Sequence, residues 1–104
     1  MVEPSLNLNS FRLTARLSSK EAIRYSPAGQ VILKCELQHS GTVLEAEKMR
    51  KVEMKLMAIG VGQIVSVLDQ LEIGQLIDAS GFMAQMGFNR KALVFHITNI
   101  NKVH

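Results

Sequence analysis

Apolar and polar residues alternate with a period of two along most of this chain. The first such run covers residues 11–17, the second residues 31–38 and the third residues 51–58. Because successive side chains of a strand point to opposite faces of a sheet, each run predicts a strand with one buried and one solvated face. The sequence therefore predicts a mainly β protein.

The segments before and between these runs predict breaks in the strands. Leu6 and Leu8 have the opposite parity to the first run, so we expect one long first strand with a bulge or bend near Asn9 and Ser10. Residues 18–29 carry turn signals and predict a long loop. The polar segment that follows the second run predicts another connection, at about residues 40–48.

The period changes to that of a helix in the second half of the chain. Apolar residues at i, i+3, i+4 and i+7 predict a short amphipathic helix over residues 62–71. Two further strands are predicted at residues 75–85, interrupted by Gly81, and at residues 92–101. Three strands, a helix and two strands is the order of an OB-fold, an all-β five-stranded Greek-key barrel with a short helix between strands 3 and 4.

Composition limits the chain to one domain of modest positive charge. The 104 residues are 47% hydrophobic and carry a net charge of +3, which permits an anionic partner. We expect a single domain over residues 1–104, with flexible ends at residues 1–5 and 102–104. The lone Cys35 favours a reducing compartment and a place in the core. With no signal-like start and no membrane-length apolar run, we expect a cytoplasmic protein without a membrane partner.

Basic and aromatic residues fall where an OB-fold binds polymers, which is on strands 2 and 3 and in the loops that follow strands 1 and 4. Cations neutralise phosphates, and a ring offers each base a face for stacking, so the combination suits single-stranded nucleic acid. The strand candidates are Lys34, Lys51 and Lys55. The loop candidates are Lys20, Arg24 and Tyr25 in the first loop, and Phe88, Arg90 and Lys91 in the last.

Other interpretations of the same residues stay open. The three strand lysines alternate with Glu36 and Glu53, a pattern that also fits cross-strand ion pairs. Residues 87–91 are also of the types that commonly form a soluble hairpin turn, and the Tyr25 ring could equally pack over the end of the barrel. We assign Phe82, like Phe95, to the core from its place in a strand.

Signatures of catalysis are missing from the sequence. No spacing of Cys and His matches a zinc site, and neither a phosphate-binding loop nor a nucleophile elbow occurs. His96 lies within a strand, where we expect it to satisfy a local hydrogen bond. The sequence therefore predicts a binding protein, not an enzyme, with no metal and no cofactor.

Four segments carry a family resemblance: Ile-Arg-Tyr-Ser-Pro-Ala-Gly at 23–29, Val-Ile-Leu-Lys-Cys-Glu-Leu-Gln-His at 31–39, Gly-Phe-Met-Ala-Gln at 81–85 and Leu-Val-Phe-His-Ile-Thr-Asn-Ile at 93–100. The chain resembles, over about residues 6–101, the bacterial primosomal replication protein N family, PriB, a relative of the single-stranded DNA-binding protein SSB. The chain ends without the acidic, glycine-rich tail of SSB, which favours the primosomal branch.

The resemblance implies a homodimeric OB-fold that binds single-stranded DNA and assists the PriA helicase in restarting replication, with SSB and other primosome proteins as further candidate partners. The family's binding surface corresponds to Arg90 and Lys91 and to the three strand lysines. We expect the dimer contact along the first strand, at Arg12, Thr14 and Arg16, because exposed strand edges are normally covered or charged. A protein–protein adaptor with weak nucleic-acid binding and an RNA-binding OB module remain alternatives.

Overall fold

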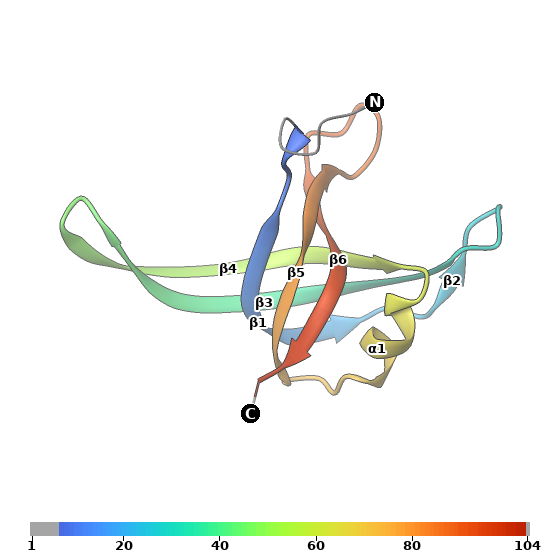
Figure 1. The fold of residues 1–104 in the computed structure, drawn as a ribbon, viewed down its shortest axis with the longest axis horizontal. Coiled ribbons are helices and arrows are strands. Elements are labelled where there is room, and N and C mark those ends of the chain that lie inside the picture. Colours follow the sequence, from blue (N-terminus) through green and yellow to red (C-terminus); the bar gives the residue numbers. More distant parts are fainter. Residues whose placement is uncertain (1–6, 104) are drawn as a thin grey trace.

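Six strands and one short helix make up residues 7–103, the part of the chain that the computed structural model describes (Figure 1). In chain order they are β1 (Phe11–Lys20), β2 (Arg24–Tyr25), β3 (Val31–Glu45), β4 (Lys48–Val61), α1 (Ile64–Gln70), β5 (Leu76–Gln85) and β6 (Leu93–Lys102). The predicted flexible end at 102–104 begins within β6, and residues 1–5 lie outside the described residues.

Five of the strands close into a barrel, as predicted. The sheet order is β1-β5-β6-β4-β3-β2, and an additional β1–β3 pairing joins the two sides. All pairings are antiparallel except β4–β6, where Ala58 pairs with Phe95 and Ile59 with His96. The helix lies between β4 and β5. These are the third and fourth strands of the prediction, and their numbers differ only because the short strand β2 was not predicted. The architecture is that of an OB-fold.

The inward residues of each alternating run meet inside this barrel. Leu17, Leu33, Leu37, Ile77 and Phe95 have no exposed surface, and Cys35 is buried among them, which confirms its predicted place in the core. Helix α1 closes one end of the barrel with its buried residues. A Cβ on Gly60 would lie 2.4 Å from a methyl carbon of Leu68, so the glycine lets the helix pack directly on β4.

The first strand differs from its prediction at both ends. It begins at Phe11, so the expected strand with a break near Asn9 and Ser10 is wrong, and Leu6 lies outside the described residues. Asn9 instead bonds to the backbone of Met83, its amide nitrogen donating to the carbonyl at 2.7 Å and its oxygen accepting from the N–H at 3.1 Å. The irregularity in β1 comes later, between Leu17 and Ser19.

The loop expected at residues 18–29 is shorter than predicted, because β1 continues to Lys20 by pairing with β3. Within the remainder, β2 pairs with the start of β3. Both pairings join residues that are distant in the sequence, and the local turn signals do not report them.

The connection expected at residues 40–48 is also wrong, because β3 and β4 form one continuous hairpin. Their pairing extends to Glu45 opposite Lys48, and Ala46 and Glu47 make the turn with φ of 51° and 66°. Two-residue turns of this kind favour Gly or Asn, and their absence hides the turn in the sequence. The outer part of the hairpin, residues 40–53, projects from the barrel as an arm (Figure 1).

Candidate nucleic-acid interface

The three lysines predicted to point outward from the central strands share one face. Lys34 lies opposite Ile59, and Lys55 and Lys51 lie opposite Gln38 and Thr42. Directly paired residues of an antiparallel ladder project to the same side, and the intervening residues Leu33, Cys35, Leu37 and Ala58 are buried. This side of β3 and β4, the outer face, therefore carries all three lysines, with Lys34 and Lys55 on the barrel wall and Lys51 on the arm.

Among the residues that the structure describes, no cross-strand ion pair forms on this face. Lys51 approaches Glu53 of its own strand at 3.5 Å, with both side chains mostly exposed, and such a pair contributes little stability. Glu36 accepts a hydrogen bond from the Ser18 hydroxyl at 2.9 Å. Between residues 7 and 103, neither Lys34 nor Lys55 forms an ion pair.

Cations of this chain divide into those that bind the protein itself and those that do not. The first group is Arg12 with Asp78, Arg16 with the Gly74 carbonyl, Lys20 with the carbonyls of Asp69 and Leu71, Arg50 with Glu45 and Lys51 with Glu53. The seven others have no side-chain hydrogen bond or ion pair within the described residues: Arg24, Lys34, Lys48, Lys55, Arg90, Lys91 and Lys102. Five of these seven, all except Lys48 and Lys102, belong to the predicted binding set. Their charges remain available to a ligand, whereas the charge of Lys20 is used within the protein.

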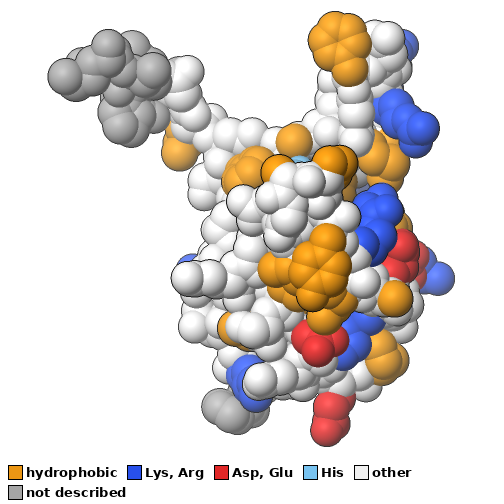
Figure 2. All heavy atoms as spheres, turned by 90° about the vertical axis from the view of Figure 1, so that its right-hand side faces the viewer, with side chains coloured by type: hydrophobic (Ala, Val, Ile, Leu, Met, Phe, Trp, Pro, Cys, Tyr) orange, Lys and Arg blue, Asp and Glu red, His pale blue; other side chains and the backbone are white. Residues whose placement is uncertain are grey.

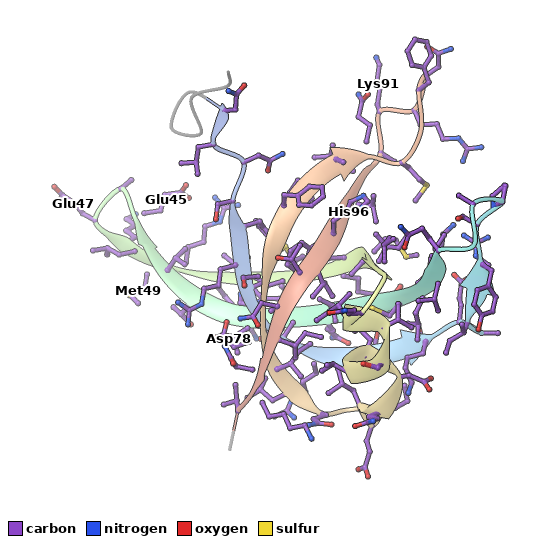
Figure 3. The ribbon with its side chains drawn as sticks, turned by 45° about the vertical axis from the view of Figure 1, so that its right-hand side comes forward. Glu45, Glu47, Met49, Asp78, Lys91 and His96 are labelled. Carbon is purple, nitrogen blue, oxygen red and sulfur yellow. The ribbon has the colours of Figure 1, made fainter. Side chains whose placement is uncertain are left out.

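The tip between β5 and β6, residues 86–92, presents an aromatic ring to solvent. The Met86 N–H donates to the Ala92 carbonyl at 2.9 Å, and the Arg90 N–H donates to the Gly87 carbonyl at 3.2 Å. This turn leaves Phe88 94% exposed, as its place at a hairpin tip predicts. Arg90 and Lys91 are exposed beside it, and the tip with its ring and cations stands clear of the barrel (Figures 2 and 3).

The two candidates of the first loop face different sides of β3. Arg24 pairs with Ile32 and Tyr25 with Val31. Because Ile32 has the parity of Lys34, Arg24 shares the outer face. Tyr25 lies on the side of Val31, which packs against the core, and its ring is 71% exposed there. The structure thus brings Arg24, but not Tyr25, to the outer face.

Phe82 and His96 form a ring pair that the sequence reasoning missed. The assignment of Phe82 to the core is wrong, since it is 38% exposed. Its ring stacks on His96 with centroids 4.7 Å apart and planes 10° apart. His96 makes no side-chain hydrogen bond in the described part of the chain, contrary to expectation. The signal was available, because buried Ile77 and Ala79 set a parity that turns Phe82 outward.

The first strand is not the fully unpaired edge that the sequence suggested. β5 pairs with residues 11–16 on one side, and β3 pairs with β1 from Arg16 onward. Arg12 forms a bidentate contact with Asp78, and this hydrogen bonding is the main cause that lowers the pKa of Asp78. The expectation of an open edge therefore holds only for the first half of the strand.

In that first half, one side of β1 has no strand partner among the described residues. Leu17 exchanges backbone hydrogen bonds with the β5 side, through Gln75 and Gly74. By alternation, Arg12 and Thr14 direct their peptide groups to the opposite side. The His39 ring nitrogen Nδ1 lies 2.6 Å from the Thr14 carbonyl oxygen. Residues 12–14 form what we call the open edge.

The closed barrel, the plugging helix and the cationic face with its exposed ring define the class as an OB-fold of the single-strand binding type. A model described as "another single-strand binding protein family" matches residues 9–99. Helix α1 has seven residues, and residues 7–103 contain no helix with the length and apolarity needed to cross a membrane.

Comparison with individual relatives shows to which family of this class the chain belongs. Replication restart protein PriB of Bordetella pertussis is 27% identical over 96 residues, which cover 92% of this chain and 90% of the relative. The solved structure of PriB from Ralstonia solanacearum is 41% identical, with a TM-score of 0.87 over 93% of this chain and 99% of that one. The single-stranded DNA binding protein of Thermus aquaticus shares the fold, with a TM-score of 0.74, 23% identity and coverage of 93% and 50%. The chain belongs to the PriB family, within the single-strand binding proteins, which confirms the resemblance.

Proposed function

We propose that this protein is a non-enzymatic, cytoplasmic single-stranded DNA-binding protein of replication restart. The observation that carries the proposal is the tip, where Phe88 is 94% exposed beside two cations that have no partner within the described residues. An exposed aromatic ring gains nothing from the core, but it offers a stacking face that any unpaired base fits. The family relationship favours DNA of a replication fork as the polymer.

The cations extend this contact from the tip across the barrel. The tip joins β5 to β6, and β6 pairs with β4, which pairs with β3, so the strand order leads from Arg90 and Lys91 to Lys34 and Lys55. Phosphates would contact these side chains and Arg24, with Lys51 further along the arm. Charge neutralisation and stacking then hold the strand without making or breaking a covalent bond.

Dimerisation and the helicase complete the proposal. Two copies of β1 joined at the open edge, at Arg12 and Thr14, would cover peptide groups that no other described strand pairs. Two joined binding faces would also hold one long strand more tightly than either face alone. The dimer would keep exposed DNA available to PriA, with SSB as a further partner. Sedimentation equilibrium measures the dimer, and a pull-down with purified PriA measures the contact.

The binding test is a fluorescence-anisotropy titration with an unstructured, labelled DNA oligonucleotide. Phe88→Ala should weaken binding by about 1–3 kcal/mol, the contribution of one stacked base. Ile73→Ala is the matched control, because Ile73 is 59% exposed and lies between α1 and β5, away from the tip. Equal affinity of Phe88→Ala and wild type would show that the ring is only a turn residue and would refute its proposed role.

A further inference from the structure

The stacked pair of Phe82 and His96 lies on the side of the barrel that carries the outer face. These two residues are directly paired in the β5–β6 ladder. His96 is next to Ile59 in the β4–β6 ladder, and Ile59 is opposite Lys34 in the β3–β4 ladder. Since the strands of a sheet lie about 4.8 Å apart, the row from Phe82 to Lys34 spans about 14 Å.

This row connects the tip with the lysines. His96 lies below the tip that carries Lys91 (Figure 3), and hydrophobic side chains gather in the hollow beneath the tip (Figure 2). The row contains two rings, one aliphatic side chain and one cation, and none of its four members is acidic. The nearby acids are engaged elsewhere, Glu36 by Ser18 and Asp78 by Arg12.

The backbone beneath the pair is closely packed, and each ring restricts the other by stacking on it. Next to Phe82, a Cβ on Gly81 would lie 1.8 Å from the His96 carbonyl oxygen, which shows how closely β5 approaches β6. A ring that is already fixed loses little conformational freedom when a ligand stacks on it. Burial does not explain the exposed part of Phe82, which faces solvent on a cationic side of the molecule.

We propose that Phe82 and His96 form a second base-stacking platform, located between Phe88 and Lys34. Its ligand is an unpaired nucleotide, whose base stacks on the pair and whose phosphate lies near Lys34. This inference rests on the proposed function and extends it. It assigns the strand a route from the tip, over the ring pair, to the central lysines.

The platform is tested with Phe82→Leu and His96→Gln in the same anisotropy titration. Leucine keeps apolar bulk but has no ring, and we expect Phe82→Leu to weaken binding about five-fold to 150-fold. We expect an effect in the same direction for His96→Gln. The slope of affinity against salt should not change, because neither variant removes a phosphate-binding cation. Phe82→Tyr keeps the ring and should retain wild-type affinity.

Two outcomes separate this inference from the proposed function. If the wild-type protein does not bind the oligonucleotide, the proposed function fails and the platform with it. If wild type binds and Phe82→Leu binds equally well, the platform alone is overturned. Equal thermal midpoints of wild type and variant exclude loss of the fold.

A measurement on the unsubstituted protein keeps the test independent of folding. An oligonucleotide that contains 5-iodouracil is cross-linked by light, and the linked peptides are identified by mass spectrometry. Cross-links in the peptide of Phe82 or of His96 support the platform. Cross-links confined to the tip around Phe88 overturn it.

Discussion

Gly81 offers a prediction whose size follows from the geometry of β5 and β6. An added Cβ would meet the His96 carbonyl oxygen at 1.8 Å, the carbon of that carbonyl at 2.9 Å and the Thr98 nitrogen at 3.0 Å. All three atoms belong to the backbone of β6, so no side-chain rotation relieves the clash. Gly81→Ala therefore requires the two strands to move apart.

The required movement sets the expected loss of stability. A carbon and a carbonyl oxygen of neighbouring strands normally approach to about 3.3 Å, so β6 has to shift by about 1.5 Å. Overpacking of this kind costs about 1–3 kcal/mol, and each weakened ladder hydrogen bond adds about 1 kcal/mol. We expect Gly81→Ala to lower the free energy of unfolding by about 2–4 kcal/mol.

Urea unfolding, followed by far-ultraviolet circular dichroism, measures this loss. At a slope of about 1.5 kcal/mol per molar urea, the midpoint should fall by about 1–3 M. Gly87→Ala is the matched control, because its Cβ would lie 3.7 Å from the nearest atom, in the Arg90 side chain. A midpoint for Gly81→Ala equal to that of Gly87→Ala would refute the reasoning from close backbone contact.

Three further predictions concern charge and burial. Replacing both Lys34 and Lys55 with Ala should reduce the salt dependence of log affinity by about 1.4, or 0.7 for each lost phosphate contact, and an unchanged slope would show that these lysines do not meet phosphate. Burial raises the pKa of Cys35 to about 11, partly offset by Lys20, so iodoacetamide at pH 8 should modify this thiol only after denaturation; rapid modification of the folded protein would contradict its burial. Because Arg12 lowers the pKa of Asp78, the ionised pair stabilises the fold above about pH 4, where Asp is ionised in the unfolded chain, and this contribution is lost as pH falls through the folded pKa. The difference in urea midpoint between wild type and Asp78→Asn should therefore shrink from pH 7 to about pH 2, and a constant difference would exclude this linkage.

The strands and their faces were predictable because each strand of the barrel has one side in the core and one side in solvent. The alternation of apolar and polar residues records these two sides directly, and this alternation correctly predicted that Lys34 and Lys55 lie on the outer face. The same rule, applied from Ile77 and Ala79, would also have turned Phe82 outward, so that error came from treating a ring as core by default.

Other features depend on contacts that no local pattern records. The arm was hidden because Ala46 and Glu47 adopt positive φ without the residues that usually signal such a turn. The separation of free from engaged cations was also inaccessible, since Arg12 meets Asp78 across 66 positions of sequence. Which charges remain for a ligand is therefore a property of the folded chain.

The most direct test of the central claim is the affinity of the wild-type protein for unstructured single-stranded DNA between about 50 and 200 mM salt. Contacts from the five unpartnered cations of the predicted binding set predict a slope of log affinity against log salt of about −3 to −4. A slope near zero, or no binding at the lowest salt, would contradict a cationic face that holds unpaired DNA.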